Sequence, residues 1–116
     1  MVKALYVPDV GDFIWLDFDP QAGREQAKRR PALALSPKDY NQKTGLVIAC
    51  PLTSQVKNYP FEVAVALGKV KGAVLSDHVK SLDWRVRKAE FIAEAPVQVL
   101  HAVQKNIAML IGAIRG

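Results

Sequence analysis

Short apolar runs, separated by polar segments that contain proline or glycine, make up the chain as far as about residue 95. The run at 12–19 (DFIWLDFD) is aromatic and aliphatic, and the runs at 31–36 (PALALS) and 46–53 (LVIACPLT) are short and apolar. Runs of this length and composition are typical of strands. Weaker patterns predict three more strands, at 61–65, 73–77 and 91–94. We therefore expect a mainly β protein.

A short helix is predicted between the second and third strands. Ser36 is expected to be an N-cap, with Pro37 at the first helical position and Asp39 as an acid in the first turn. This combination favours the start of a helix. Gly45 marks its end, so we expect a single helical turn.

After Pro96 the apolar residues recur at steps of three and four, which is typical of an amphipathic helix. Its apolar face carries Leu100, Val103, Ile107, Leu110, Ile111 and Ile114, opposite the polar Gln98, His101 and Lys105. Burying all six aliphatic side chains would contribute roughly 9 to 18 kcal/mol, at about 1.5 to 3 kcal/mol each. Strands followed by such a helix predict a small barrel with a helical cover.

The composition indicates one packed domain that covers residues 1–116. Half of the residues are hydrophobic and 23% are charged, which excludes a mainly disordered chain. The first residues do not resemble a signal peptide, and no apolar run is long enough to span a membrane. The single cysteine, Cys50, cannot form an internal disulfide. We therefore expect a soluble protein of the reducing cytoplasm with no membrane partner.

The chain is basic, with 16 Lys and Arg against 11 Asp and Glu and a net charge of +5. Basic surfaces bind nucleic acid because neutralising phosphates releases condensed counterions. Charge alone does not decide the question, since many small basic domains bind no nucleic acid.

Several classes of chemistry lack the residues that they need. The two histidines, His78 and His101, have no second ligand at the spacing of a helical zinc site, so we expect no metal and no other cofactor. The chain has no Walker-type phosphate loop and no GxSxG motif, and Cys50 lies in an apolar run where a thiol is usually a small buried hydrophobe. What remains is the polar segment 19–30 and the strand end at 53–55. On the residues alone, a solvated loop is the favoured interpretation of the charged segment.

These remaining segments carry motifs that resemble the MazF/PemK toxins of bacterial toxin-antitoxin systems. The matching strings are Gly11-Asp12, WLDFDP at 15–20, Glu25-Gln26, Arg30-Pro31, PLTSQ at 51–55, YPFEV at 59–63 and DHVKSLDWR at 77–85. Several ordered motifs at matching spacing make the resemblance specific, and it extends from about Tyr6 to Arg87 and more loosely through the final helix.

The resemblance implies an SH3-like, strongly bent antiparallel β-barrel with short helices and a C-terminal helix, which forms a homodimer. It implies the toxin component of a type II system, a sequence-specific, metal-independent endoribonuclease (mRNA interferase) that cleaves single-stranded mRNA or rRNA and arrests translation and growth. In this family a 2'-hydroxyl attacks the adjacent phosphate and leaves a 2',3'-cyclic phosphate and a 5'-hydroxyl end.

The same resemblance assigns the catalytic residues. Arg30 corresponds to the arginine that meets the phosphate oxygens, and Thr53 to a hydroxyl that orients the same group. A guanidinium can bind two oxygens with parallel donors, and it is a more credible acid than base. Glu25 is expected to accept a proton or to position RNA, although a surface acid that pairs with Lys28 or Arg29 explains it equally well. Arg29 could share the role of Arg30, because the two are adjacent.

RNA contacts are expected from residues around the catalytic pair, because basic and aromatic side chains bind unpaired nucleotides. These candidates are Gln26, Lys28, Arg29, Ser54, Gln55, Lys57, Asn58 and Tyr59. The family also implies an antitoxin whose acidic C-terminal segment occupies the same basic groove, with DNA contacted only through the antitoxin.

Two alternatives stay open. CcdB-like toxins share the barrel and poison DNA gyrase without nuclease chemistry, but they carry a tryptophan near the C-terminus that this chain lacks. An RNA-binding barrel that does not cleave is the second alternative, and the presence of both Arg30 and Thr53 argues against it.

Overall fold

The computed structural model describes residues 5–18 and 29–113 of the chain. The strands and helices follow one another as β1 (Asp12–Asp17), β2 (Arg29–Ala34), α1 (Lys38–Thr44), β3 (Leu46–Thr53), β4 (Glu62–Leu67), β5 (Val70–Leu75), the 3-10 turn η1 (Ser76–His78), β6 (Lys80–Asp83), β7 (Glu90–Glu94) and α2 (Val97–Leu110). Neither α1 nor α2 has the length and apolar character needed to cross a membrane.

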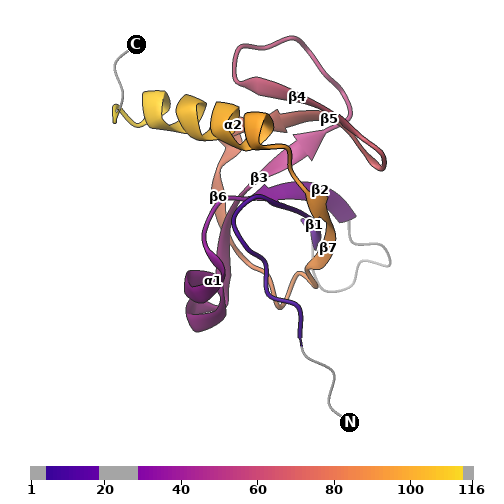
Figure 1. Ribbon diagram of the computed structural model, residues 1–116, viewed down its shortest axis with the longest axis vertical. Helices are drawn as coiled ribbons and strands as arrows, with labels where there is room; N and C mark the ends of the chain where they lie inside the picture. The colour runs from indigo at the N-terminus through magenta and orange to yellow at the C-terminus, as the bar shows by residue number, and fades with distance from the viewer. Residues whose placement is uncertain (1–4, 19–28, 114–116) are drawn as a thin grey trace.

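The strands form one antiparallel sheet in the order β4-β5-β3-β2-β1-β7, and β6 pairs with β3 beside this path. Figure 1 shows the sheet curling into a half-barrel, with α2 across the end that holds β4 and β5 and α1 near the opposite end. The expected bent antiparallel β fold with a C-terminal helix is therefore confirmed.

Two apolar clusters lie on the two faces of the central strands. Phe13 belongs to the cluster beneath α2, whereas its neighbour Ile14 belongs to the cluster inside the curl, and neither is exposed. Because consecutive side chains of a strand point to opposite faces, a strand buried on both faces is a continuous apolar run. This explains why β1, β2 and β3 appear in the sequence as runs rather than as alternating patterns.

The start of α1 differs from the prediction. Pro37, not Ser36, precedes the first helical residue, and no side chain caps the helix. The Ser36 hydroxyl instead donates to the side chain of the buried Asn41 over 2.6 Å and accepts the N–H of Ile48 over 2.8 Å. A buried amide needs hydrogen-bond partners. Ser36 therefore stabilises the buried Asn41 instead of capping the helix. The helix runs for seven residues, more than the single turn expected, and ends as predicted at Gly45, whose φ is +74°.

The C-terminal helix begins after Pro96 as predicted, but its apolar face is not buried along its whole length. Val103 is fully buried, whereas Leu110 is 45% exposed and Ile111, beyond the last helical residue, is 72% exposed. Ile114 lies outside the described residues. The last turn extends beyond the sheet (Figure 1), so the expected burial of all six aliphatic side chains is wrong.

Two strands have boundaries that the apolar pattern did not indicate. β6 was missed because only Leu82 of its four residues is buried, and this leaves almost no hydrophobic signal. β5 begins at Val70 rather than at 73, because a tight turn at Gly68 connects it directly to β4.

Candidate functional site

The two residues expected to be catalytic, Arg30 and Thr53, line the same groove. β2 and β3 pair antiparallel, with Ala32 opposite Pro51. Continuing this register by two residues leads to Arg30 on one strand and Thr53 on the other. Both side chains lie on the wall of a groove of about 530 Å³. Residues 23 positions apart in the chain are thus brought together at the ends of neighbouring strands.

Arg29 and Arg30 belong to β2, and not to the polar loop in which the sequence analysis placed them. They extend the strand because the pairing with β1 continues past the apolar run, with Leu16 opposite Arg30 and Asp17 opposite Arg29. The ordered backbone of a strand fixes Arg30 more firmly than a loop would. Glu25, Gln26 and Lys28, which were expected beside it, lie outside the described residues.

The guanidinium of Arg29 is committed to holding strands together. Its Nη1 lies 2.8 Å from the Asp17 carboxylate, and its Nη2 forms an ion pair with Glu90 and donates to the carbonyl of Lys88 over 2.6 Å. Burial alone would lower the pKa of Arg29, but hydrogen bonds and ion pairs with Asp17 and Glu90 outweigh it and raise this pKa above its ordinary value. Arg29 lines the groove with few donors left for a substrate.

Arg30 differs from its neighbour in this respect. It is exposed on the groove wall, and within residues 5–18 and 29–113 no side chain or carbonyl accepts a hydrogen bond from its guanidinium. An arginine with its five donors directed to solvent can bind an oxyanion in two-pronged geometry. The structure therefore favours Arg30 over Arg29 as the phosphate ligand.

Thr53 is the last residue of β3 and is held from two sides. Its Oγ1 accepts the N–H of Gln55 over 3.1 Å, which leaves the hydroxyl proton available to donate. On the other side, β5 approaches so closely that a Cβ at Gly72 would lie 2.0 Å from the Thr53 carbonyl oxygen. Only glycine fits there, and its φ of +134° is one that L side chains rarely adopt.

A second groove, of about 410 Å³, adjoins the first at Thr53. It is lined by Thr53, Gln55, Lys57, Tyr59, Glu62, Leu75 and His78. The Tyr59 hydroxyl donates to Asp77 over 2.6 Å, and this hydrogen bond raises the pKa of Tyr59. The ring of Tyr59 also contacts Phe61 edge to face, with centroids 5.6 Å apart. The tyrosine is therefore oriented while remaining 44% exposed.

Most of the other expected RNA-binding residues surround these two grooves. Ser54 and Gln55 line the first, and Lys57 and Tyr59 line the second. Asn58 lines neither groove. It lies in the turn between Lys57 and Tyr59, where its φ is +57°. The N–H groups of Lys57 and Tyr59 both donate to the Glu62 carboxylate, which shapes this turn.

Several residues that line the grooves were not identified as such from the sequence, among them three basic or aromatic ones of the first groove and a histidine of the second. Trp15, Lys69 and Lys71 line the first groove, and His78 lines the second. Lys69 lies in the turn between β4 and β5, and Lys71 is the second residue of β5. Nothing in the sequence indicated that this hairpin faces β2.

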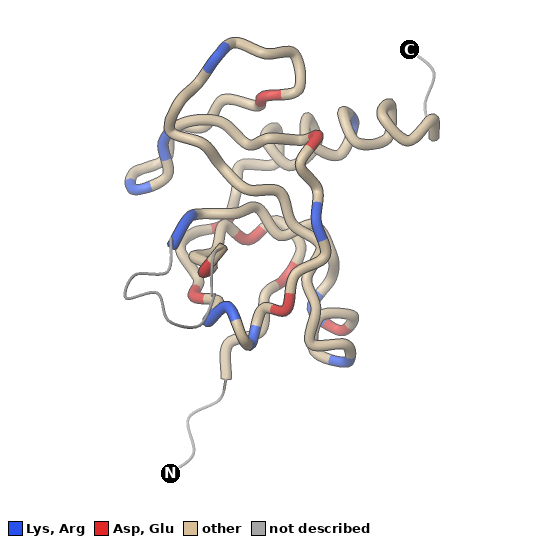
Figure 2. The backbone as a smooth tube through the Cα atoms, turned by 180° about the vertical axis from the view of Figure 1, so that it is seen from behind, with Lys and Arg blue, Asp and Glu red and all other residues tan. Residues whose placement is uncertain are grey.

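The first groove is strongly basic. Arg30, Lys69 and Lys71 lie along it beside the ion-paired Arg29, and none of the described residues that line it is acidic. Figure 2 shows the basic positions of the β4–β5 hairpin and of the start of β2 gathered on the same side of the molecule. A groove of this charge favours a polyanion such as a nucleic-acid backbone.

Other chemical groups lie away from the grooves. Within the described ranges, no three His, Cys, Asp or Glu side chains come together in a way that could hold a metal ion. Cys50 is fully buried as predicted, and burial raises the pKa of its thiol to about 12. Trp84 belongs to the core, where its Nε1 donates to the Asn41 carbonyl over 2.8 Å.

Comparison with known proteins gives consistent matches along nearly the whole chain. Residues 9–111 match the family described as PemK-like, MazF-like toxin of type II toxin-antitoxin system. The endoribonuclease toxin MazF of Escherichia coli (strain K12) is 48% identical over 107 residues, which cover 92% of this chain and 96% of that protein.

Solved structures give the same result. A MazE-MazF crystal structure from Deinococcus radiodurans (Form-III) superposes with a TM-score of 0.85 at 55% identity and covers 92% of this chain and 98% of that one. A crystal structure of MazF from the same organism (Form-I) superposes with a TM-score of 0.83 at 56% identity, again over 92% of this chain and 98% of that one.

Proposed function

The chain belongs to the PemK-like, MazF-like toxin family of type II toxin-antitoxin systems, and we propose that it is an endoribonuclease that cleaves single-stranded RNA. The observation that carries this proposal is the groove lined by both the exposed Arg30 and Thr53, whose other charged residues in the described part of the chain, Arg29, Lys69 and Lys71, are all basic. The similarity to an endoribonuclease toxin over 92% of the chain supports it.

The reaction is an internal transesterification of the RNA backbone. A ribose 2'-oxygen attacks the adjacent phosphorus, the bond from phosphorus to the 5'-oxygen breaks, and the products are a 2',3'-cyclic phosphate and a 5'-hydroxyl end. Negative charge accumulates on the two nonbridging oxygens in the transition state. Donors placed in advance around these oxygens lower the barrier, because they need no reorganisation when the charge develops.

Arg30 and Thr53 supply these donors. The guanidinium of Arg30 binds the two nonbridging oxygens through parallel N–H groups. Thr53 donates its hydroxyl proton to one of these oxygens and restricts the rotation of the phosphate. The close approach of Gly72 to the Thr53 carbonyl and the N–H of Gln55 on its Oγ1 keep this hydroxyl in place.

Two protons move during the reaction. The carboxylate of Glu25 accepts the proton of the attacking 2'-hydroxyl and later releases it to solvent, and Arg30 donates a proton to the departing 5'-oxygen and regains one from solvent. The roles are divided in this way because the side chain of Arg30 is almost always protonated before the reaction. It therefore has a proton to donate but no free lone pair with which to accept one. No step needs a metal ion or another cofactor.

The nucleotides around the cleaved bond contact the residues of both grooves. Lys57 and Tyr59 hold unpaired bases in the second groove, and Ser54, Gln55 and Asn58 offer hydrogen-bond groups to base edges. Gln26 and Lys28 add contacts from the segment that precedes β2. The RNA strand thus crosses Thr53, where the two grooves meet.

The protein acts as a homodimer, and its partner is an antitoxin whose acidic C-terminal segment covers the basic groove and excludes RNA. The crystal structures of a relative as a MazE-MazF complex support this arrangement. DNA is contacted only through the antitoxin. The site of action is the cytoplasm, where cleavage of mRNA or rRNA stops translation and growth.

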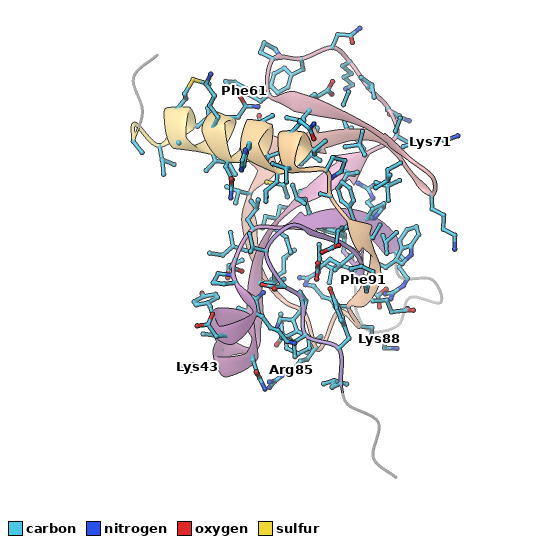
Figure 3. All side chains as sticks on the ribbon, in the orientation of Figure 1. Lys43, Phe61, Lys71, Arg85, Lys88 and Phe91 are labelled. Carbon is cyan, nitrogen blue, oxygen red and sulfur yellow. The ribbon has the colours of Figure 1, made fainter. Side chains whose placement is uncertain are left out.

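The experiment that tests this function is cleavage of a long unstructured RNA by the pure protein in EDTA, with all new 5' ends mapped. We expect cuts at a recurring short motif, with 5'-hydroxyl ends. The assay is repeated with Arg30→Ala and Thr53→Ala, which should lose cleavage. Lys43→Ala, which also removes a surface charge, should cleave like the wild type, because Lys43 lies on α1, away from the grooves (Figure 3). Intact RNA with a correctly folded protein would overturn the proposal and lead to tests of gyrase binding and of RNA binding without cleavage.

A further inference from the structure

A third groove, of about 360 Å³, continues the substrate groove beyond the catalytic pair. Its lining residues are Trp15, Leu67, Gly68, Lys69, Phe91, Ile92 and Ala93. Two of them, Trp15 and Lys69, also line the groove that holds Arg30 and Thr53. A ligand in the first groove therefore has a continuous surface that leads past Trp15 toward Phe91.

Phe91 is the most distinctive residue of this extension. Its side chain is 50% exposed, although it lies in a strand beside the fully buried Ile14. A β-bulge interrupts the pairing at this point, because Phe13 and Ile14 pair with Ala93 and Phe91 and leave Ile92 as the extra residue. Bulges redirect side chains and occur frequently next to functional sites.

The ring of Phe91 is also held in one orientation. The Tyr6 ring contacts it edge to face, with the centroids 5.9 Å apart and an angle of 63° between the planes. An aromatic ring that is supported on one side and exposed on the other can receive a second flat ring at little entropic cost.

The charge of the extension identifies the type of ligand. Lys69 lines this groove together with Phe91 and Trp15, and none of the described residues that line it is acidic. Figure 3 shows Lys71 projecting from the same hairpin as Lys69, and Phe91 lower down on β7. Aromatic faces next to basic side chains are the combination that binds single-stranded nucleic acid, because bases stack on the rings and phosphates pair with the cations.

We propose that Phe91, Trp15 and Lys69 form a stacking subsite for one unpaired nucleobase of the RNA, outside the nucleotides at the cleaved bond. This inference rests on the proposed function and extends it. β1 separates β2 from β7, and Arg30 pairs with Leu16 whereas Phe91 pairs with Ile14, so Arg30 and Phe91 lie two strands apart and two positions out of step. The subsite therefore takes a base that flanks the scissile phosphate, and Lys69 holds the phosphate between them.

The test uses RNA oligonucleotides that contain the mapped cleavage motif and a single abasic position, moved stepwise along the flanks. Stacking of one base is worth a factor of about 5 to 100 in affinity. We expect one flanking abasic position to lower the kcat/KM of the wild-type protein by a factor in this range. With the intact RNA, the kcat/KM of Phe91→Ala should be lower than that of the wild type by the same factor. The abasic position should not lower the kcat/KM of Phe91→Ala any further, whereas it should still lower that of Phe91→Trp.

A direct readout of stacking accompanies the kinetics. The same oligonucleotide carries 2-aminopurine at the identified position and a 2'-deoxyribose at the cleavage site, which prevents attack. We expect its fluorescence to be quenched on binding to the wild-type protein and to Val86→Ala, a control for loss of an exposed apolar side chain, because Val86 is 61% exposed and lines none of the three grooves. Phe91→Ala should bind without this quenching.

Several outcomes would overturn the inference. Equal kcat/KM values for Phe91→Ala and the wild type would exclude the subsite while leaving the proposed function intact. A change from dimer to monomer in Phe91→Ala would show that a second copy of the chain covers this surface instead. Weaker binding of an acidic antitoxin peptide with unchanged RNA cleavage would assign the groove to that partner. Failure of the wild type to cleave any RNA would remove the proposed function itself.

Discussion

The Nη1 of Arg29 lies 2.8 Å from the Oδ1 of Asp17 and ties the first residue of β2 to the last residue of β1. Glu90 and the carbonyl of Lys88 bind the other side of the same guanidinium and add β7 to this contact. The next residue, Arg30, is exposed on the wall of the groove that contains Thr53. Two adjacent arginines are thus placed differently: Arg29 holds the strands together, and Arg30 is the one that we propose binds the RNA phosphate.

Replacing each arginine with alanine should separate these roles in stability measurements. We expect Arg29→Ala to lower the free energy of unfolding by about 1 to 3 kcal/mol, because Asp17 loses a charged partner in a site where it is only 13% exposed. Arg30→Ala should change it by less than about 0.5 kcal/mol, as is usual for exposed positions. Urea denaturation followed by circular dichroism measures both values. A larger loss in Arg30→Ala than in Arg29→Ala would contradict the assignment.

Gly72→Ala should reduce stability and cleavage together. The new methyl group would lie 2.0 Å from the Thr53 carbonyl oxygen, so β5 has to move away from the strand end that holds Thr53. We expect a loss of at least about 2 kcal/mol in unfolding free energy and a clear fall in kcat. Gly112→Ala is the matched control, because its φ is also positive, at +78°, its Cβ would have no neighbour within 4 Å, and it lines none of the three grooves. An equal effect of both substitutions on kcat would show that the contact with Thr53 is irrelevant.

Cys50 should be unreactive in the folded protein at ordinary pH. Burial raises the pKa of its thiol from an ordinary 9.0 to about 12, and only the thiolate attacks iodoacetamide. We expect no modification of Cys50 in the native protein at pH 8 and full modification in urea, measured by mass spectrometry. The buried, protonated thiol also contributes to the free energy of unfolding. This contribution is complete below pH 9 and disappears as the pH rises toward 12, because the unfolded chain loses the thiol proton first. Fast modification of the native protein would show that Cys50 is accessible.

Tyr59→Phe should weaken RNA binding without changing the chemical step. The substitution removes the hydrogen bond to Asp77, which orients the ring, while the aromatic surface remains. We expect KM to rise by about 3- to 10-fold, which corresponds to about 0.7 to 1.4 kcal/mol, the usual net contribution of one hydrogen bond, and kcat to stay unchanged. Steady-state cleavage of a short RNA with the mapped motif measures both constants. A fall in kcat with an unchanged KM would instead place Tyr59 at the reacting phosphate.

The apolar runs of the sequence were sufficient to predict β1, β2 and β3, because these strands are buried on both faces. β6 was missed for the opposite reason, since its outward residues Lys80, Ser81 and Asp83 leave only one apolar position. The extent of burial along α2 depends on where the sheet ends, which the spacing of Leu110 and Ile111 does not reveal.

The candidate site was predictable in part. Motifs located Arg30 and Thr53 and the second groove around Tyr59. They did not reveal that Lys69 and Lys71 complete the first groove, because this depends on how the β4–β5 hairpin is placed against β2. The separate role of Arg29 depends on ion pairs with residues 12 and 61 positions away in the chain, and no local pattern indicates such partners.

The most direct test of the account is the single-turnover cleavage rate of one RNA oligonucleotide with the mapped site, measured in EDTA for the wild type and for Arg30→Ala, Thr53→Ala and Lys43→Ala. Removing one donor to a developing oxyanion costs about 100- to 1000-fold in rate. We expect losses of this size in Arg30→Ala and Thr53→Ala, with circular dichroism spectra like that of the wild type, and no loss in Lys43→Ala. Rates in Arg30→Ala and Thr53→Ala equal to that of the wild type would contradict the central claim that these two residues act on the phosphate.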